Sequence, residues 1–461
     1  MSIPGLGQIA PTAVQTTTSA AVSPTTTQSL EPFWEYRFEV AHGSTLNIKL
    51  VSGTAEKDGT ELAPSTPYAF TATKTRINTW HGCTLEISSE PGAVYDAYTS
   101  EPTADETPMV SYVNLHFKLD GLRATAERTG QMGPRVLVIG PPNSGKTSLV
   151  RMLTGWATRV GRQPLVVNAD CREGMLALPG TLSAAVFATI IDPTSEWGST
   201  PSSGPSPVPV KLPLAYYYGM ASPDDNPRFF KRLLSRLAVA STSRLTEDPG
   251  VKTSGMLIDS GGVNAKGGYD HIAHIVAEFS VNIVLVVGSE RVGSEMQKRF
   301  AGQQTSLGET ITVVGLDKSG GVVERDAGFM QQVREAAIRE YFFGSSKTTL
   351  SPFTQQMDFA ALSMWKVNQA PTASDEDSYS EAIEKAEPSL MMQNCTLAVM
   401  YATVHDTAET IRDSNVMGFV YVAEVDEKRR KLKVLAPVSA RLGDRPLLWG
   451  SWPEPMVSLV G

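Results

Sequence analysis

The sequence has few cysteines and no long hydrophobic run, and both absences narrow the class of protein. Its three cysteines, Cys83, Cys171 and Cys395, lie far apart and form no CxxC pair. We therefore expect neither a disulfide framework nor a zinc site, and we predict three reduced thiols of an intracellular protein. No stretch of about 18 apolar residues occurs, so no membrane-spanning helix is expected.

The N-terminal segment lacks the charged start and the apolar core of a secretory signal. Residues 1–30 are instead rich in Thr, Ser, Ala and Pro, which predicts a disordered tail. Strong positive charge is also missing, because the net charge is -8. A surface that is basic throughout is thereby excluded, although a local basic groove that touches RNA is still compatible with this charge.

Hydrophobic residues make up 41% of the 461 residues, enough for several buried cores. Residues 31–118 contain short alternating runs such as 36–40 and 46–50, bounded by Gly, Ser and Pro. A period of two over five residues is typical of half-buried strands, so we predict an N-terminal β-sandwich here.

Residues 119–344 follow a different pattern, in which buried apolar runs alternate with helical periodicity. The predicted strands are 135–139, 164–170, 255–259 and 281–287, and the predicted helices are 146–160, 227–243 and 269–279. This alternation indicates a multidomain α/β protein with a central doubly wound parallel sheet. A helix over 113–128 connects this domain to the β-sandwich, and residues 198–210, rich in Pro and Ser, are predicted to be a mobile surface insertion.

Residues 345–461 are again rich in strands, with a predicted hairpin between 418–425 and 431–436. We expect a C-terminal α+β domain, rich in β structure, that flanks the central domain.

A phosphate-binding motif, GxxxxGK[ST], occupies residues 140–147 (Gly-Pro-Pro-Asn-Ser-Gly-Lys-Thr), between a predicted buried strand and a predicted helix. In this context the loop amides and the helix N-terminus bind phosphate, most simply that of ATP with Mg²⁺. Lys146 is placed to reach the β- and γ-phosphates, and Thr147 to bind Mg²⁺. The residues expected to contact the nucleotide are Pro142, Asn143, Ser144, Gly145, Lys146, Thr147 and Ser148.

The magnesium site needs a carboxylate at the end of a strand, and two candidates are present. Asp170 ends the strand that follows the phosphate loop in sequence, an arrangement typical of kinases, and we predict it as the Mg²⁺ ligand, directly or through water. Asp259 ends the strand at 255–259 and remains open as an ordinary carboxylate at the edge of the sheet.

Six further segments make the chain similar to a known family: 59–62 (GTEL), 79–83 (TWHGC), 133–136 (GPRV), 178–181 (LPGT), 319–325 (SGGVVER) and 338–344 (IREYFFG). With the phosphate loop they resemble the Clp/Grc family of polynucleotide 5′-hydroxyl kinases. Within it they resemble the fungal-type subunit of the pre-mRNA cleavage and polyadenylation factor, cleavage factor IA. The likeness extends from about residue 31 to 450.

The resemblance implies three domains, in agreement with the periodicity, and it implies that the β domain holds the adenine through Glu35 and Lys74. Without it, each of these residues would be read as a solvated charge on a strand. In an active member, Asp170, Lys146 and Arg325 would be the catalytic residues.

The sequence departs from the active members of that family in two places. Their Asp-x-Gly-Gln segment is replaced by Asp-Cys-Arg-Glu at residues 170–173. Active members also have a lid segment with arginines over the transferring phosphoryl group; the first arginine is retained here as Arg325, and the second position is Met330. Methionine cannot stabilise the charge that develops on a transferred phosphoryl group. The resemblance therefore implies an ATP-bound, inactive nuclear subunit that assembles with the scaffold subunit that binds the RNA polymerase II tail.

Two other interpretations remain. The first is an active RNA 5′-hydroxyl kinase, with Arg334 or Arg291 completing the lid. The second is an unrelated P-loop switch or small-molecule kinase, against which the strand-rich region before the loop and the C-terminal segments argue.

Overall fold

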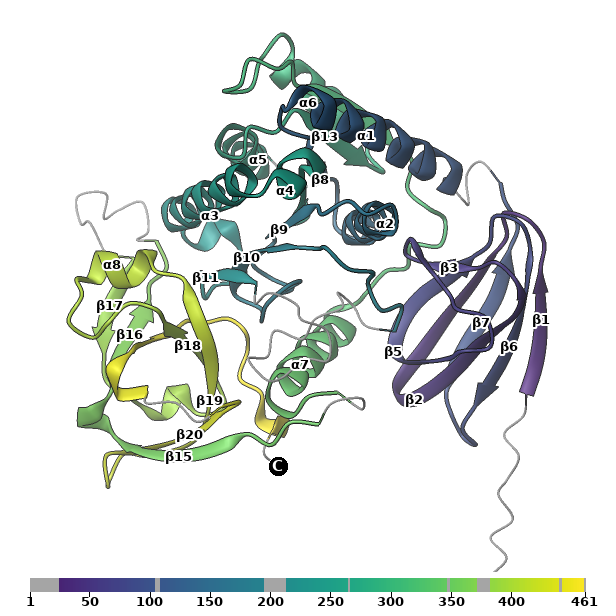
Figure 1. Ribbon diagram of the computed structural model, residues 1–461. Coiled ribbons are helices and arrows are strands. Elements are labelled where there is room, and N and C mark those ends of the chain that lie inside the picture. Colours follow the sequence, from purple (N-terminus) through teal and green to yellow (C-terminus); the bar gives the residue numbers. More distant parts are fainter. Residues whose placement is uncertain are drawn as a thin grey trace, which may run out of the picture.

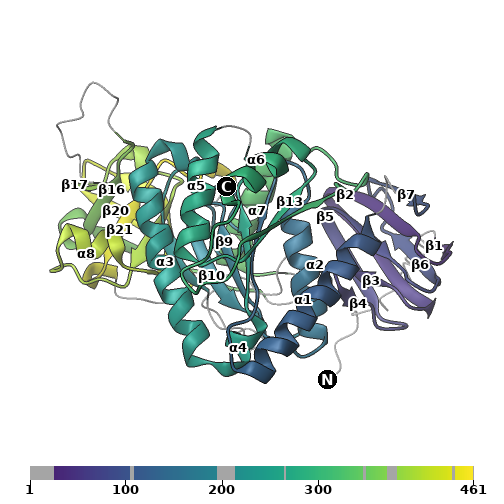
Figure 2. The same cartoon turned by 90° about the horizontal axis from the view of Figure 1, so that it is seen from above.

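The computed structural model describes residues 25–103, 108–194, 213–263, 266–345, 349–370, 382–438 and 442–459. Three sheets follow one another along the chain and lie side by side, with the central one between the other two (Figures 1 and 2). The predicted multidomain α/β architecture is thus confirmed. The predicted insertion at 198–210 lies outside the described residues.

The N-terminal sheet is antiparallel, and its longest strand bends to pair on both halves. β2 pairs with β7 through Glu35–Val40 and with β6 through Leu46–Gly53, while β5 follows it along most of its length. Apolar side chains from the inner faces form one core. The strands are β1 (Thr25–Leu30), β2 (Glu35–Gly53), β3 (Glu56–Lys57), β4 (Thr60–Glu61), β5 (Pro67–Asn78), β6 (Cys83–Ser89) and β7 (Tyr95–Ser100).

The predicted tail over residues 1–30 is wrong for its last six residues. Thr25–Leu30 form β1, which pairs with Cys83–Ser89 of β6. The segment has no hydrophobic alternation of its own. A partner almost 60 residues away in sequence supplies its ladder hydrogen bonds, and composition does not reveal this kind of non-local pairing.

The central sheet has the order β11-β10-β9-β12-β8-β13-β14. Its five strands from β9 to β14 are parallel, as predicted, and β10 and β11 add an antiparallel edge. The strands are β8 (Arg135–Ile139), β9 (Leu165–Ala169), β10 (Thr181–Val186), β11 (Leu214–Tyr217), β12 (Met256–Ser260), β13 (Ile283–Val287) and β14 (Thr312–Leu316).

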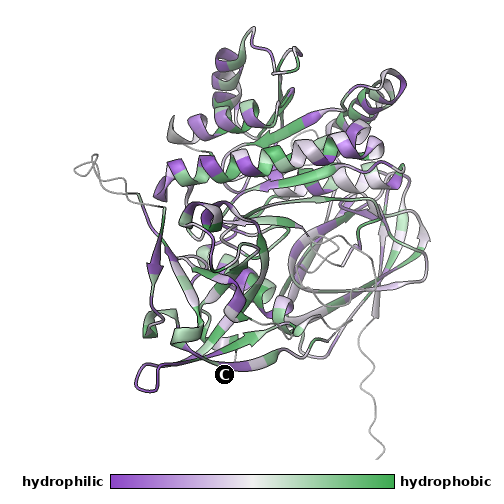
Figure 3. Ribbon diagram, turned by 60° about the vertical axis from the view of Figure 1, so that its left-hand side comes forward, coloured by the Kyte–Doolittle hydropathy of each residue, from purple (hydrophilic) through white to green (hydrophobic). Residues whose placement is uncertain are grey.

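Helices cover both faces of this sheet, whose strands are hydrophobic along their length (Figures 2 and 3). Near-continuous apolar strands are expected when both faces are buried. The helices are α1 (Met109–Thr129), α2 (Lys146–Arg159), α3 (Pro227–Glu247), α4 (Pro249–Ser254), α5 (Lys266–Glu278), α6 (Glu290–Phe300) and α7 (Ala327–Phe343). None of the described helices combines the length and apolar character that a membrane span requires.

Two helices join the central sheet to its neighbours. α1 lies between the N-terminal and central sheets, so the boundary predicted between residues 118 and 119 falls inside a helix. α7 follows β14, and its C-terminal half packs on the third sheet, where the Tyr341 hydroxyl accepts a hydrogen bond from the backbone amide of Phe419 at 2.9 Å.

The C-terminal sheet has the order β15-β20-β19-β18-β21-β16-β17 and contains the predicted hairpin, formed by β19 and β20. Its elements are β15 (Phe353–Asp358), β16 (Ser363–Val367), β17 (Ile383–Ala386), β18 (Thr396–Met400), α8 (Ala408–Asp413), β19 (Val416–Asp426), β20 (Lys431–Ala436) and β21 (Pro446–Trp449). All three cysteines are free and buried.

Candidate nucleotide-binding site

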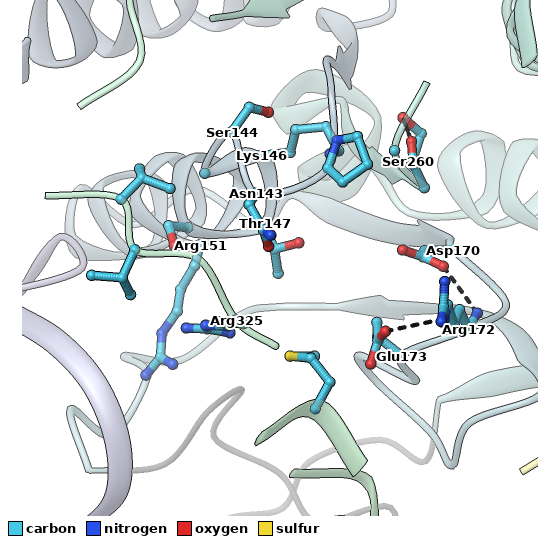
Figure 4. Close-up of a pocket in the computed structure, with 18 of the residues that line it drawn as sticks. Asn143, Ser144, Lys146, Thr147, Arg151, Asp170, Arg172, Glu173, Ser260 and Arg325 are labelled. Carbon is cyan, nitrogen blue, oxygen red and sulfur yellow. Dashed lines mark hydrogen bonds and ion pairs between the residues drawn. The ribbon is translucent and has the colours of Figure 1, made fainter. Parts of the chain in front are cut away.

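A cavity of about 610 Å³ lies between the N-terminal and central sheets. Its walls come from β2 and β5 on one side, from the phosphate loop and α2 in the middle, and from the loop after β9, α5 and α7 on the other. This volume is in the range of small-molecule and cofactor sites. All seven predicted phosphate-loop residues, Pro142 to Ser148, line it. Figure 4 shows the labelled loop side chains together at one wall.

The phosphate loop has the backbone shape that its sequence requires. Gly145, with φ 88°, precedes the first turn of α2, and Gly140 has φ 157°. A Cβ atom at Gly140 would stand 2.5 Å from the carbonyl oxygen of Val287, so only glycine fits against β13. Asn143 also has a positive φ, 53°, which asparagine tolerates better than most residues. Three residues with positive φ thus wind the loop between β8 and α2.

The polar side chains of the loop are partly paired with the protein and partly open to a ligand. Lys146 Nζ donates to the carbonyl oxygen of Pro141 at 2.8 Å, and Thr147 Oγ1 donates to Asp259 Oδ2 at 2.5 Å. Among the described residues, Ser144 Oγ and Asp259 Oδ1 are buried without a hydrogen-bond partner. Buried polar atoms rarely stay unpaired. A phosphate group and a hydrated divalent cation fit these two positions.

The order of the strands decides which carboxylate stands next to the loop. β12 lies between β8 and β9, so Asp259 at the end of β12 is the immediate neighbour of the loop and Asp170 is one strand further away. Asp259 is 2% exposed, and burial raises its pKa to about 7, against the opposing effects of Thr147 and Lys146. The sequence had favoured Asp170. In the structure Asp259, not Asp170, contacts Thr147.

Asp170 nevertheless faces the same cavity. Its Oδ1 accepts a hydrogen bond from the backbone amide of Arg172 at 2.9 Å, and burial raises its pKa, an effect that the charge of Lys146 opposes. Burial also lowers the pKa of Lys146, although Asp259 and Asp170 both favour its charged form. The loop lysine thus lies in the field of two carboxylates.

The two residues predicted to hold the base are placed differently. Lys74 lines the cavity, where it pairs with Glu39 at 2.9 Å and lies 5.1 Å from the ring centroid of Phe329. Glu35 is fully buried, and the cavity wall does not include it. Its carboxylate instead pairs with Arg37 at 2.8 Å and with Arg76 at 3.2 Å.

Three further arginines line the cavity, and no motif in the sequence singles them out: Arg37, Arg76 and Arg151. Strand alternation offered one signal, since Arg37 is two residues beyond Glu35 and therefore on the same face of β2. Glu35 is the carboxylate that orients Arg37 and Arg76 from behind.

The lid segment contains both residues that the sequence singled out. Arg325 is exposed and lines the cavity, and Met330, in the first turn of α7, lines it as well. In Figure 4, Arg151 and Arg325 stand on one side of the cavity, and Asp170, Arg172 and Glu173 on the other. Arg334, one turn after Met330, also lines the cavity, but its guanidinium donates to Glu173 and Glu454. Arg291 is not among the lining residues.

The apolar residues of α3 belong to the core. Phe229, Phe230, Leu233 and Leu234 are each at most 2% exposed. The apolar side of this helix is therefore covered by the chain itself.

Three families of known proteins match the chain, one for each sheet. Residues 29–126 match the N-terminal beta-sandwich domain of polyadenylation factor, residues 140–344 the mRNA cleavage and polyadenylation factor CLP1 P-loop, and residues 350–454 the pre-mRNA cleavage complex II protein Clp1. The order of the three matches follows the order of the sheets.

Similar proteins that match over their full length occur in fungi. The mRNA cleavage and polyadenylation factor clp1 of Botryotinia fuckeliana is 54% identical over 470 residues, and CLP1 of Pyricularia oryzae is 46% identical, each match covering 100% of both chains.

Two solved structures share the fold over 93% of this chain. A wild-type Clp1p–Pcf11p complex has a TM-score of 0.82 at 26% identity, with 98% of that chain covered. A second structure describes an extended interface between Pcf11p and Clp1p and the basis for ATP loss in a point mutant, with a TM-score of 0.82 at 27% identity and 99% covered.

Proposed function

The chain belongs to the Clp1 family of mRNA cleavage and polyadenylation factors, and from this premise we propose that it is an ATP-bound assembly subunit of such a factor and not a working RNA kinase. The observation that carries the proposal is a formed phosphate loop beside an altered lid. Lys146 and Thr147 stand ready for a polyphosphate, while methionine occupies position 330 at the same cavity.

Within this proposal the loop from Pro142 to Ser148 holds the phosphates, and Lys74, Arg37 and Arg76 border the base and sugar. Mg²⁺, when bound, neutralises phosphate charge. Thr147 would hold it with Asp259, and Asp170, the carboxylate favoured from the sequence, would contribute through water. The unpartnered Ser144 hydroxyl and Asp259 oxygen support this assignment.

The partner in this proposal is a Pcf11-type scaffold subunit, because the two similar structures are of Clp1p with Pcf11p. Cleavage and polyadenylation of mRNA precursors is a nuclear process, so we place the protein in the nucleus. Bound ATP would stabilise the folded chain, because it binds the folded and not the unfolded form. Since the folded chain is the form that assembles, ATP would thereby favour assembly.

The test begins with the nucleotide that copurifies with the full chain. We expect ATP, identified by chromatography after denaturation, at close to one per chain. Lys146→Ala and Thr147→Ala should lose most of it and assemble more weakly with the Pcf11-type subunit, whereas Thr147→Ser, which keeps the hydroxyl, should retain both properties. Full assembly of a nucleotide-free variant would show that ATP is incidental.

An active RNA 5′-hydroxyl kinase is the second candidate, because Asp170, Lys146 and Arg325 line one cavity. Incubation of the protein with radiolabelled ATP and an oligoribonucleotide with a free 5′-hydroxyl separates the two candidates. Our proposal predicts no transfer above the level of Lys146→Ala, and transfer that depends on Asp170 would establish the kinase instead.

A further inference from the structure

Arg334 is the first buried residue of α7, and it binds two carboxylates from different parts of the chain. Its Nη2 and Nε donate to Glu454 at 2.5 Å and 3.2 Å, and its Nη1 donates to Glu173 at 3.2 Å. Glu454 belongs to the C-terminal segment after β21, and Glu173 belongs to the loop after β9. The guanidinium therefore joins three segments at the edge of the cavity.

An aromatic ring from the same C-terminal segment completes the cluster. The guanidinium carbon of Arg334 lies 4.5 Å from the ring centroid of Trp452, a distance typical of a cation–π contact. The indole Nε1 donates to the carbonyl oxygen of Arg172 at 2.8 Å. The backbone of Trp452 is fixed to the central domain, since its amide donates to the carbonyl oxygen of Gly219 at 3.1 Å.

The position of Arg334 in α7 gives these contacts their significance. The first two turns, residues 327–333, are exposed or half-exposed, and they include Met330 at the cavity wall. The C-terminal half of α7 is anchored in the third sheet by Ile338, Tyr341 and Phe342, which are all buried. Arg334 is thus the buried anchor nearest to these two turns, which also contact the N-terminal sheet where Phe329 lies beside Lys74.

The cluster also explains the departure at residues 172 and 173. Glu173 does not face the cavity as a free negative charge, because Arg334 neutralises it. The carbonyl oxygen of Arg172 accepts the hydrogen bond from the indole of Trp452, while the side chain of Arg172 is largely exposed. The segment that differs from the active kinases is thus the docking point for the C-terminal segment.

We propose that Arg334, Glu173, Trp452 and Glu454 form a latch by which the C-terminal segment holds the first two turns of α7 against the nucleotide cavity. The latch fixes α7 whether or not nucleotide is present. Its second consequence, slow release of bound nucleotide, rests on the proposed function. As a rigid unit, α7 cannot move away from the cavity without separating the buried guanidinium of Arg334 from two carboxylates and an aromatic face.

Hydrogen exchange in the full chain without added nucleotide tests the latch directly. In Glu454→Gln and Arg334→Met, we expect the amides of residues 327–335 to exchange roughly tenfold faster than in the wild type, because charge-assisted hydrogen bonds are lost. Release of a fluorescent ATP analogue should accelerate by a similar factor. The glutamine variant keeps a neutral acceptor, and it decides the question if Arg334→Met does not fold.

Asp413→Asn provides the matched control. Asp413 of α8 binds both Nε and Nη2 of Arg232 of α3, so this pair also joins the C-terminal domain to the central one, but neither residue lines the cavity. The control should leave exchange in α7 and nucleotide release unchanged.

Three results would overturn the inference or part of it. If both latch variants exchanged at the wild-type rate, the latch proposal would be wrong. If exchange accelerated equally in Asp413→Asn, the cause would be a general loosening of the C-terminal domain. Faster exchange with unchanged nucleotide release would remove the coupling to the cavity. A wild-type chain that binds no nucleotide would sink the proposed function, while the exchange measurement would still decide the latch.

Discussion

At the scale of single residues, several charged side chains around the cavity form ion pairs with one another. Arg334 is bound by Glu173 and Glu454, and Glu35 is bound by Arg37 and Arg76. The phosphate loop differs, since Ser144 Oγ and Asp259 Oδ1 are buried without partners in the described structure. These two unpartnered oxygens lie where the sequence motif predicts phosphate and metal.

The two candidate carboxylates allow a prediction about magnesium. Asp259→Asn should weaken Mg²⁺-dependent retention of ATP by roughly tenfold or more, because it removes a charged ligand next to Thr147. Asp170→Asn should weaken it less, since Asp170 stands one strand further from the loop. Titration of Mg²⁺ with a fluorescent ATP analogue measures both variants. A larger effect of Asp170→Asn would restore the assignment made from the sequence.

The motif predicts residues 142–148 as the phosphate contacts, and all seven line the cavity, because one short segment contains the whole loop. It did not identify Asp259 as the contact of Thr147, because the neighbour of β8 is set by strand order, a property of the whole sheet. The latch was equally hidden, since Arg334 and Glu454 lie 120 residues apart. Local chemistry was readable from the sequence, and contacts between distant segments were not.

At the scale of elements, α2 serves two neighbours at once. Its first turn forms part of the phosphate loop, and its middle packs on the turn between β3 and β4 through Gly155 and Gly59. A Cβ atom at Gly155 would stand 2.5 Å from the carbonyl oxygen of Asp58, so the two backbones approach more closely than side chains permit. The helix that follows the phosphate loop is thereby fixed to the N-terminal sheet.

Gly155→Ala should lower the free energy of unfolding by about 1–3 kcal/mol, although alanine favours helix, because the new methyl group overpacks this contact. Gly121→Ala on α1 is the matched control. It meets no atom within 4 Å and should stabilise the chain by up to about 1 kcal/mol. Denaturant unfolding of both variants checks the pair, and a neutral or stabilising Gly155→Ala would show that the contact is loose.

α1 carries a buried histidine that predicts a pH dependence of stability. His116 is 5% exposed and lies 5.6 Å from the ring of Trp156, and burial, aided by the charge of Arg123, lowers its pKa from 6.5 to about 4. Between these two pH values, His116 is therefore protonated in the unfolded chain and neutral in the folded chain. This contribution to stability is complete above pH 6.5 and is lost as the pH falls toward 4.

Between pH 6.5 and about 5.5, the wild type should lose about 1 kcal/mol more of its free energy of unfolding than His116→Leu loses. Urea unfolding at the two pH values measures the difference. Parallel behaviour of the two proteins would mean that His116 is protonated in the folded state.

Elements with strong periodicity were predictable, and those that depend on a distant partner were not. The strand over residues 135–139 and the start of α2 at Lys146 match the predictions, since a buried strand followed by a glycine-rich loop leaves one solution. β1 was missed because its residues are polar and its pairing partner is β6.

At the scale of the whole molecule, residues of both the N-terminal and the central sheet line the cavity, and α7 connects the cavity to the third sheet. No single sheet supplies the site. A ligand that touches β5, the phosphate loop and α7 together stabilises their arrangement and not one part alone.

Addition of ATP and Mg²⁺ to nucleotide-free protein should therefore raise its melting temperature by roughly 3–4 °C at about 100 times the Kd. Lys146→Ala should show no such rise at the same concentrations. A calorimetric scan that shifts only one of two resolved transitions would indicate that the sheets respond separately.

Trp156 gives this architecture a built-in optical reporter. Its indole nitrogen, on α2, donates to the buried carboxylate of Glu56 on β3 at 3.0 Å. The carboxylate also accepts from Arg159 at 3.2 Å. If β3 and α2 separated, water would reach this indole and its fluorescence would shift to longer wavelength, a change that can be followed without a dye once the other six tryptophans are replaced.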